Sequence, residues 1–313
     1  MKNKLTNANF PMDVEGRVYH VGVKRGETAN RIITVGDHVR ARRIAKLLDG
    51  PEVKGRTVFE LVSQRGFTTF TGTYQGVPVS IIAIGMGTPM VDFLLREIRA
   101  CVEGPIAIIR FGSCGSLNAL AGCGDMIVPS GAYSITRNYD HFLDGHDTEP
   151  AYHFSKVFDA DPTLSRLLAA SLTATLTANT SGCKVITGGL NATTDSFYST
   201  QGRSDPAFRD DNERLVEEIL PRERPGTDAL EMETAALFHL ARCANPKNPV
   251  RAAATMMVFA NRVTNEFITP EVVDLLEPAA GKAVLEALIK VELEQEHPEK
   301  GSVWERIHVE VEA

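Results

Sequence analysis

The chain has 313 residues, of which 43% are hydrophobic and 23% charged, as in an ordinary folded protein and unlike a long disordered segment. Its formal net charge of −7 argues against a nucleic-acid partner. The five cysteines form no C-x-x-C pair or metal-ligand spacing, and no apolar stretch could cross a bilayer, so we expect a cytoplasmic protein with reduced thiols and no metal or membrane partner.

Short β-branched runs, each followed by glycine, predict buried strands at 32–35, 79–84, 106–110 and 184–187. Apolar residues at helical spacing predict helices at 37–48, 88–102, 228–244 and 279–296, the first capped by Asp37 and the last beginning after Pro278. Because strands and helices alternate, we expect an α/β fold with a mixed central β-sheet flanked by helices, in a single domain over residues 1–313.

The segment 204–227 departs from this alternation. It contains three prolines and many charged residues, and it predicts a long surface excursion with a short helix at 213–220. Such excursions are usually either functional lids or disordered segments, and the sequence leaves both interpretations open.

The first predicted strand leads into a candidate anion site. Gly36 allows close backbone approach, and the helix that follows it offers free N–H groups and the positive end of its dipole. Arg40 lies in the first turn of that helix, where a cation is unfavourable unless an anion is nearby. A solvated surface arginine is an equally good interpretation of Arg40 alone.

Arg110 gives a stronger indication of an anion. It ends an apolar strand, and an isolated buried charge is very costly, so it must be paired. The residues after it, Phe111 to Ser116, are rich in glycine and small hydroxyl side chains and predict a loop that could wrap a tetrahedral oxyanion, with Ser113 among its donors. The alternative is an arginine paired only with an internal carboxylate.

A second candidate site contains Phe197, Gln201 and Arg203. In an extended segment, residues two apart point the same way, so the amide of Gln201 and the guanidinium of Arg203 could act together. Gln201 can donate and accept, whereas Arg203 only donates, and this pattern matches the O2, N3–H and O4 edge of uracil. A polar loop beside a core phenylalanine explains the same residues equally well.

Glu231, Met232 and Glu233 open a predicted helix. Two carboxylates that flank a methionine suit the paired hydroxyls of a ribose, with Met232 packed against the sugar. For either glutamate alone, simple stabilisation of a helix N-terminus is a strong alternative.

In this order along the chain, these motifs resemble the nucleoside phosphorylase-I superfamily and, within it, the members that cleave uridine. The resemblance runs from about His20 to Leu288 and includes Arg65 and Asn261-Arg262. It implies the fold of that superfamily, a mixed sheet partly closed into a barrel and flanked by helices. The excursion and the extended ends are similar to those of eukaryotic members, which are commonly homodimers.

The resemblance also implies a role for each matched position. Phosphate would be held by Gly36, Arg40, Arg110 and Ser113, and by Arg65 of the neighbouring subunit. Ribose would be held by Glu231, Met232, Glu233 and by His20 across the interface. The base would be bound by Phe197, Gln201, Arg203 and Arg262, where Arg262 replaces the Ser-Asp pair of purine-cleaving relatives.

The reaction that this resemblance implies is phosphorolysis of uridine to uracil and ribose 1-phosphate, with Arg110, Glu233, Gln201 and Arg203 as catalytic residues. Inorganic phosphate is then a substrate, and no cofactor or metal is expected. The sequence leaves open whether 2′-deoxyuridine is also cleaved. Three alternatives are a hydrolytic nucleosidase, a purine phosphorylase, and a non-catalytic protein that binds or stores nucleosides.

Overall fold

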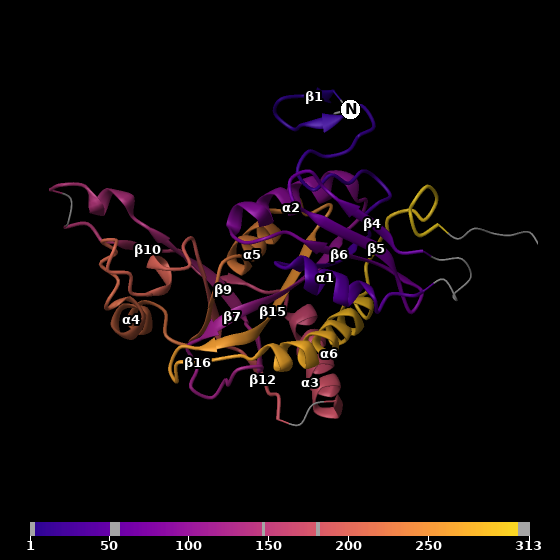
Figure 1. Cartoon of the computed structure of the whole chain (residues 1–313). Helices are drawn as coiled ribbons and strands as arrows, with labels where there is room; N and C mark the ends of the chain where they lie inside the picture. The colour runs from indigo at the N-terminus through magenta and orange to yellow at the C-terminus, as the bar shows by residue number, and fades with distance from the viewer. Residues whose placement is uncertain (1–3, 51–56, 146–147, 180–181, 306–313) are drawn as a thin grey trace, which may run out of the picture.

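A mixed β-sheet forms the centre of the computed structural model, which describes residues 4–50, 57–145, 148–179 and 182–305 (Figure 1). Two long strands, β7 (Ile106–Ser116) and β15 (Val250–Asn261), run parallel along their whole length. On its other side, β7 pairs first with β3 (Arg31–Val35), which is parallel to it, and then at its end with β14 (Thr227–Glu231), which is antiparallel. The sheet therefore divides at β7.

One branch continues from β3 through β6 (Val77–Ala83) and β5 (Thr68–Tyr74) to β4 (Phe59–Val62). The other continues from β14 through β13 (Leu190–Thr194) and β9 (Gly131–Arg137) to β10 (Tyr152–Phe154). The short strands are β1 (Leu5–Thr6), β2 (Met12–Asp13), β8 (Met126–Val128), β11 (Phe158–Asp159), β12 (Val185–Thr187) and β16 (Glu266–Phe267). The described pairings confirm the expected mixed sheet and include no closed ring of strands.

Helices cover both faces of the sheet. Figure 1 shows α2 (Thr88–Cys101) and α5 (Thr234–Cys243) on one side of the strands, and α1 (His38–Ala45), α3 (Pro162–Asn179) and α6 (Pro270–Ile289) on the other. Each layer buries its own apolar cluster, represented by Leu94 and Phe238 on the first side and by Ile44, Leu168 and Val284 on the second. None of the helices in the described ranges combines the length and apolar character needed to cross a membrane.

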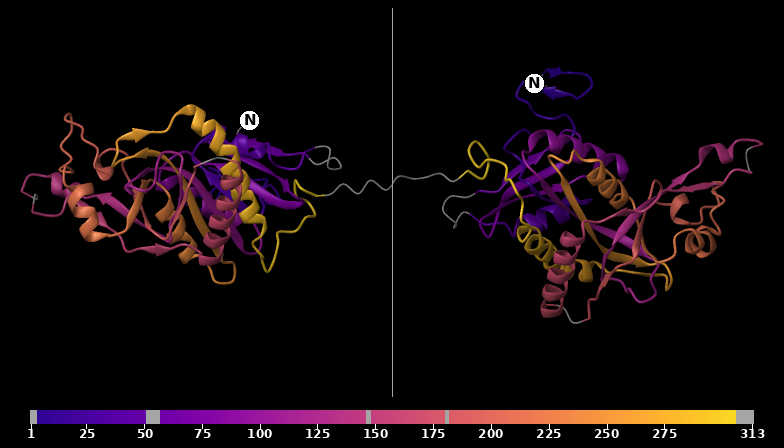
Figure 2. Two further views of the ribbon diagram at one scale, coloured as in Figure 1. Left: turned by 90° about the horizontal axis from the view of Figure 1, so that it is seen from below. Right: turned by 180° about the vertical axis from the view of Figure 1, so that it is seen from behind.

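An arm, defined as residues 131–145 and 148–154, carries β9 and β10 away from the body of the molecule (Figures 1 and 2). The predicted excursion 204–227 lies against it and contains a π-helical turn, Leu215–Ile219, followed by α4 (Leu220–Glu223). Two 3-10 turns, Tyr139–Phe142 in the arm and Ser199–Gln201 before the excursion, complete the described elements. A separate small core that includes Tyr133, Tyr152 and Leu215 joins the arm to the excursion.

The structure corrects three predicted boundaries. β7 does not end at Arg110 but continues to Ser116, because β15 supplies a partner for its whole length. The predicted helix 228–244 begins as strand β14, and α5 starts only at Thr234. The predicted helix 279–296 begins at Pro270 instead, and Pro278 lies inside α6, where packing against α1 and α3 outweighs the one lost hydrogen bond.

Candidate functional site

The N-terminus of α1 is already capped by its own side chain. Asp37 accepts hydrogen bonds from the backbone N–H groups of Val39 and Arg40, each at 3.1 Å. The expectation that these N–H groups are free for an anion is therefore wrong. Gly36, just before the cap, fits the predicted close approach: a Cβ atom there would lie 3.2 Å from the carbonyl oxygen of Gly85.

Arg40 is a buried residue, with 4% of its surface exposed, so the interpretation as a solvated surface arginine is wrong. Its Nε donates to Glu277 at 2.7 Å, and its Nη2 donates to the hydroxyl of Ser113 at 2.8 Å. A further contact, from Nη1 to the carbonyl oxygen of Phe111, is 3.3 Å long. Arg40 is thereby fixed against the end of β7.

Arg110 lies on the same stretch of β7 and is 3% exposed. Its Nη2 donates to Glu233, and its Nε lies 3.4 Å from a carboxylate oxygen of Glu231. The alternative of pairing with an internal carboxylate is thus realised. However, Nη1 of Arg110 is buried with no hydrogen-bond partner among the described residues. A buried donor without a partner is costly and suits a site that an acceptor can enter.

We call Gly36, Arg40, Arg110 and Ser113 the strand-edge cluster, because they come from the end of β3, the start of α1 and the part of β7 that begins beside the end of β3. Thr34 and Arg110 are register partners in the sheet, so the two strands deliver these residues to one edge. Gly112 gives the Arg110 guanidinium its room, since a Cβ atom there would lie 3.2 Å from Nη2.

Glu231 is the last residue of β14 and is buried in a dense set of donors. It accepts from the amide of Asn191 at 2.8 Å, from the hydroxyl of Thr193 at 2.5 Å and from the hydroxyl of Thr234 at 2.9 Å. It also accepts from the backbone N–H of Glu233 at 2.9 Å. Glu231 therefore fixes the turn that carries Met232 and Glu233.

Glu233 is also buried, at the position that precedes the first turn of α5. One of its oxygens accepts from the backbone N–H of Gly87 at 2.6 Å, and the other faces Arg110. Burial raises the pKa of Glu233, Arg110 opposes that shift, and the neighbouring charge of Glu231 adds to it. Met232, between the two acids, is partly exposed.

Gln201 and Arg203 meet, but not through the extended backbone that the sequence suggested. Gln201 ends a 3-10 turn, and Gly202 adopts a left-handed conformation with φ of 61°. This reversal lets Nη1 of Arg203 donate to Oε1 of Gln201. The amide Nε2 of Gln201 donates to the hydroxyl of Thr194 at 2.9 Å, and that hydroxyl donates to the carbonyl oxygen of Glu231 at 3.0 Å. The two predicted sites are therefore linked.

The Phe197 ring is 48% exposed, and the Arg203 guanidinium lies over it at 3.7 Å from the ring centre. Burial, together with the nearby charge of Arg262, lowers the pKa of Arg203 to about 10, which leaves it charged at neutral pH. Arg262 donates to the backbone carbonyl oxygens of Gln201 at 3.0 Å and Gly202 at 3.4 Å. In this structure it contacts the backbone of the turn that carries Gln201.

Arg65 and His20 lie together elsewhere on the surface. Arg65 is exposed; its Nη2 donates to the hydroxyl of Tyr19, and its guanidinium lies 4.7 Å from the centre of the Tyr19 ring. His20 stacks on Phe93 of α2, with ring centres 3.9 Å apart, and its Nδ1 is 2.7 Å from Glu97. The described contacts of these two residues do not reach the strand-edge cluster.

Sequence reasoning missed the residues that hold the site residues in place. Glu277, from the middle of α6, contacts Arg40 across more than two hundred positions of the chain, so no local pattern marks it. Asn191, Thr193 and Thr194 do carry a local signal, since three polar residues in a strand that leads to Phe197 predict a polar, buried strand face.

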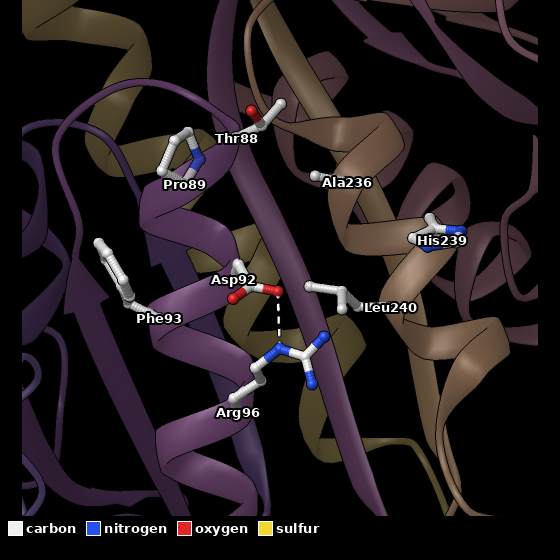
Figure 3. A pocket seen from close by; sticks show the side chains of 8 residues that line it. All are labelled: Thr88, Pro89, Asp92, Phe93, Arg96, Ala236, His239 and Leu240. Atoms are coloured by element: carbon white, nitrogen blue, oxygen red, sulfur yellow. Dashed lines mark hydrogen bonds and ion pairs between the residues drawn. The ribbon is translucent and has the colours of Figure 1, made fainter. Parts of the chain in front are cut away.

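The structure also contains an open pocket of about 370 Å³ between α2 and α5 (Figure 3). Pro89, Phe93, Ala236 and Leu240 contribute its apolar lining, and Asp92 pairs with Arg96 beside them. It contains none of the predicted site residues, although Thr88, one of its lining residues, follows the Gly87 that binds Glu233.

Cys114 is buried in β7. Burial and the charges of Glu231 and Asp228 raise the pKa of its thiol, so it is not a reactive nucleophile.

Comparison with known proteins places this geometry in a family. Residues 30–290 match the model of the phosphorylase superfamily. The chain is 31% identical over 272 residues to the uridine phosphorylase of Thermococcus kodakarensis. The matched region covers 85% of this chain and 86% of that protein. It is 30% identical over 253 residues to a DeoD-type purine nucleoside phosphorylase of Myxococcus xanthus, covering 80% and 89%.

A solved structure from a study of two uridine phosphorylases of the oomycete Phytophthora capsici is similar over 93% of this chain and 100% of its own, with a TM-score of 0.87 and 40% identity. The family match spans the strand-edge cluster, the two buried glutamates and the turn at Gln201. The chain therefore belongs to the phosphorylase superfamily.

Proposed function

We propose that this protein catalyses the phosphorolysis of uridine to uracil and ribose 1-phosphate. The observation that carries the proposal is the pairing of Arg110 with Glu233, on the strand that also presents Ser113 to Arg40, with the buried Nη1 of Arg110 left without a partner among the described residues. A phosphate oxygen that accepts from this group would lie beside the acids that suit a ribose.

The charges of the cluster support a phosphate that enters by exchange. In the free protein each buried arginine is paired with a carboxylate, Arg40 with Glu277 and Arg110 with Glu233. Phosphate would compete with Glu233 for Arg110, and the released carboxylate would accept hydrogen bonds from the ribose hydroxyls. The raised pKa of Glu233 reflects the cost of its buried charge, which two hydroxyl donors would lower.

The base site supports uracil through the donors and acceptors that remain. Gln201 uses one N–H for Thr194 and one lone pair for Arg203, so one donor and one acceptor are left for O2 and N3–H of uracil. Nη1 of Arg203 is engaged by Phe197 and Gln201, whereas Nη2 has no partner among the described contacts and is available to O4. The close structural relative from a uridine phosphorylase study supports the same base.

In this mechanism the phosphate attacks C1′ of the ribose on the face opposite the base, and the C1′–N1 bond breaks as the new C1′–O bond forms. Arg40 and Arg110 fix the nucleophile, and Glu233 orients the sugar for in-line attack. The electron pair of the broken bond passes to uracil, where Gln201 and Arg203 stabilise the developing negative charge. Phosphate is the co-substrate, so the reaction needs no cofactor.

We also propose that the active unit is a homodimer in which Arg65 and His20 act across the interface. Within one chain Arg40 and Arg110 face the three carboxylates of Glu277, Glu231 and Glu233, which leaves no net positive charge for a phosphate dianion. Arg65, exposed beside His20, supplies that charge if it reaches the site of the other subunit. Free cysteines at all five positions support a cytoplasmic location.

The test is release of uracil from uridine with and without phosphate, with inosine as a second substrate. We expect uracil release that depends on phosphate and produces ribose 1-phosphate. Uracil release that does not need phosphate would identify a hydrolytic nucleosidase, cleavage of inosine would identify a purine phosphorylase, and uridine binding without turnover would identify a non-catalytic binding protein.

A further inference from the structure

The turn that carries Gln201 and Arg203 is held from two sides by side chains outside it. We call residues 196–203 the base loop. On one side Arg262 donates to the carbonyl oxygens of Gln201 and Gly202. On the other, the amide of Asn212 donates to the carbonyl oxygens of Ser199 and Arg203, both at 3.0 Å. Asn212 thereby joins the two ends of the turn that contains Gln201.

Asn212 is well placed to control the shape of this turn. It is 5% exposed, and its Nδ2 supplies one proton to each carbonyl oxygen, so neither bond is easily replaced by water. The carbonyl oxygen of Ser199 also accepts from the backbone N–H of Gly202 at 3.1 Å, the bond that closes the 3-10 turn. Asn212 therefore strengthens the bend that brings Arg203 against Gln201.

Asn212 is in turn fixed by the contact between the excursion and the arm. The preceding residue, Asp211, has a left-handed φ of 50°, a backbone conformation that residues other than glycine adopt less readily. Its carboxylate accepts from Arg209 and lies 2.9 Å from Nε2 of His141 in the arm. Asp210 pairs with Arg137, also in the arm. These ion pairs hold the strained residue and so set the position of Asn212.

We propose that Asn212 is a positioning residue for base recognition, through which the excursion and the arm hold Gln201 and Arg203 in the arrangement that stabilises departing uracil. The inference rests on the proposed function and assigns the segment 204–227 to bracing of the base loop. Both of these hydrogen bonds from Asn212 go to backbone carbonyl oxygens of the loop, so its effect on the reaction passes through Gln201 and Arg203.

The experiment compares Asn212→Ala with Asn30→Ala. Asn30 is a matched control: it is 2% exposed and its amide also donates to two backbone carbonyl oxygens, those of Glu103 at 2.6 Å and Pro105 at 2.7 Å. Asn212→Ala loses two hydrogen bonds and Asn30→Ala loses three, since Oδ1 of Asn30 also accepts from the backbone N–H of His297 at 2.5 Å, so both variants are expected to have a lower Tm. Only Asn212→Ala is expected to change how strongly kcat/KM depends on the leaving base.

The discriminating measurement is kcat/KM for uridine and for 5-fluorouridine, whose base is a better leaving group and needs less stabilisation. We expect Asn212→Ala to lower kcat/KM by about tenfold for uridine and by about threefold for 5-fluorouridine, with KM for phosphate within about twofold of wild type. In Asn30→Ala the ratio between the two substrates stays that of the wild type.

Asp211→Gly is the second variant, in case Asn212→Ala does not fold. Glycine tolerates the φ of 50°, but the contacts with His141 and Arg209 are lost, so the same selective defect is expected at about threefold for uridine. Equal losses for both nucleosides, or no loss, in the folded variants would overturn the inference. If wild-type protein fails to release uracil with phosphate, the proposed function itself is wrong.

Discussion

Arg110 and Glu233 contact each other in the free protein, and this pairing gives each of them two possible states. Without phosphate, Arg110 neutralises a buried carboxylate; with phosphate, the same guanidinium can bind the anion and leave Glu233 to the ribose. Nη1 of Arg110, which has no hydrogen-bond partner among the described residues, belongs to this pair. The pairing that the sequence presented as an alternative to anion binding is therefore compatible with it.

Arg110→Ala is expected to lower the kcat for uridine phosphorolysis by at least about tenfold, because a charge-assisted hydrogen bond to the phosphate is lost. The measurement is uracil release at saturating uridine across a range of phosphate concentrations. Arg31→Ala is the control, since Arg31 is a buried arginine of β3 that pairs with Glu296 and whose buried Nε also has no partner within the part of the chain that the structure describes. Activity of Arg110→Ala within about threefold of the control would contradict the proposed role.

Glu233→Gln is expected to stabilise the free protein at alkaline pH while it lowers activity. Because burial raises the folded-state pKa of Glu233, the protein bears a cost for this charge that is complete above the folded pKa and disappears below the unfolded value of about 4.3. The gain in Tm from glutamine should therefore be larger at about pH 8 than at about pH 5. A lower Tm than wild type at every pH would mean that the attraction of Arg110 outweighs the cost of burial.

At the scale of elements, the uninterrupted run of β7 from Ile106 to Ser116 determines the site. The sequence of Phe111 to Ser116 predicts a loop because of its glycines and small residues, but β15 and β14 provide hydrogen-bond partners for this stretch. The two glycines leave room for arginine side chains that lie against the strand: Gly112 for Arg110, and Gly115 for Arg262. Both arginine side chains therefore lie against β7 at positions without a Cβ atom.

Gly112→Ala is expected to raise KM for phosphate several-fold, on the order of 1 kcal/mol, because the new methyl group would lie 3.2 Å from Nη2 of Arg110 and displace it. KM for uridine at saturating phosphate should change less. Gly72→Ala is the control, since its methyl group would meet Leu48 at a similar 3.3 Å in strand β5. A change in KM for phosphate that is the same in both variants would show that strand packing, not Arg110, is affected.

For the molecule as a whole, the proposed dimer makes each active site depend on two chains. Arg65 and His20 lie on the same side of the molecule. His20 stacks on Phe93, and Phe93 also lines the pocket of Figure 3. If Arg65 completes the phosphate site of the other subunit, a chain without Arg65 still has an intact half-site of its own.

Arg65→Ala and Arg110→Ala are each expected to be poorly active alone and to regain activity when mixed and allowed to exchange subunits. A mixed dimer contains one site with both arginines, so random exchange should restore roughly a quarter of wild-type activity. The measurement is uracil release after co-refolding, with each variant refolded alone as the control. An absence of recovery in dimers shown to be mixed would place Arg65 in its own subunit's site or outside both.

The sequence by itself predicted the alternation of strands and helices, the cap at Asp37, and a buried, paired Arg110 on a strand, because these depend on local spacing and on the cost of a buried charge. It also identified Gln201 and Arg203 as a pair, although the extended backbone that it implied is wrong. The sequence pattern predicts no helix at α3. It also predicts that α6 begins after Pro278, whereas the helix begins at Pro270.

Only the tertiary structure decided which residues hold the site together. Glu277 reaches Arg40 from α6, Thr194 connects Gln201 to Glu231, and Asn212 closes the base loop from the excursion. The first joins segments far apart in the chain and the other two join neighbouring elements, but in each case the partner depends on how those segments pack. A local sequence pattern can show that a buried polar group needs a partner, but the fold selects which residue provides it.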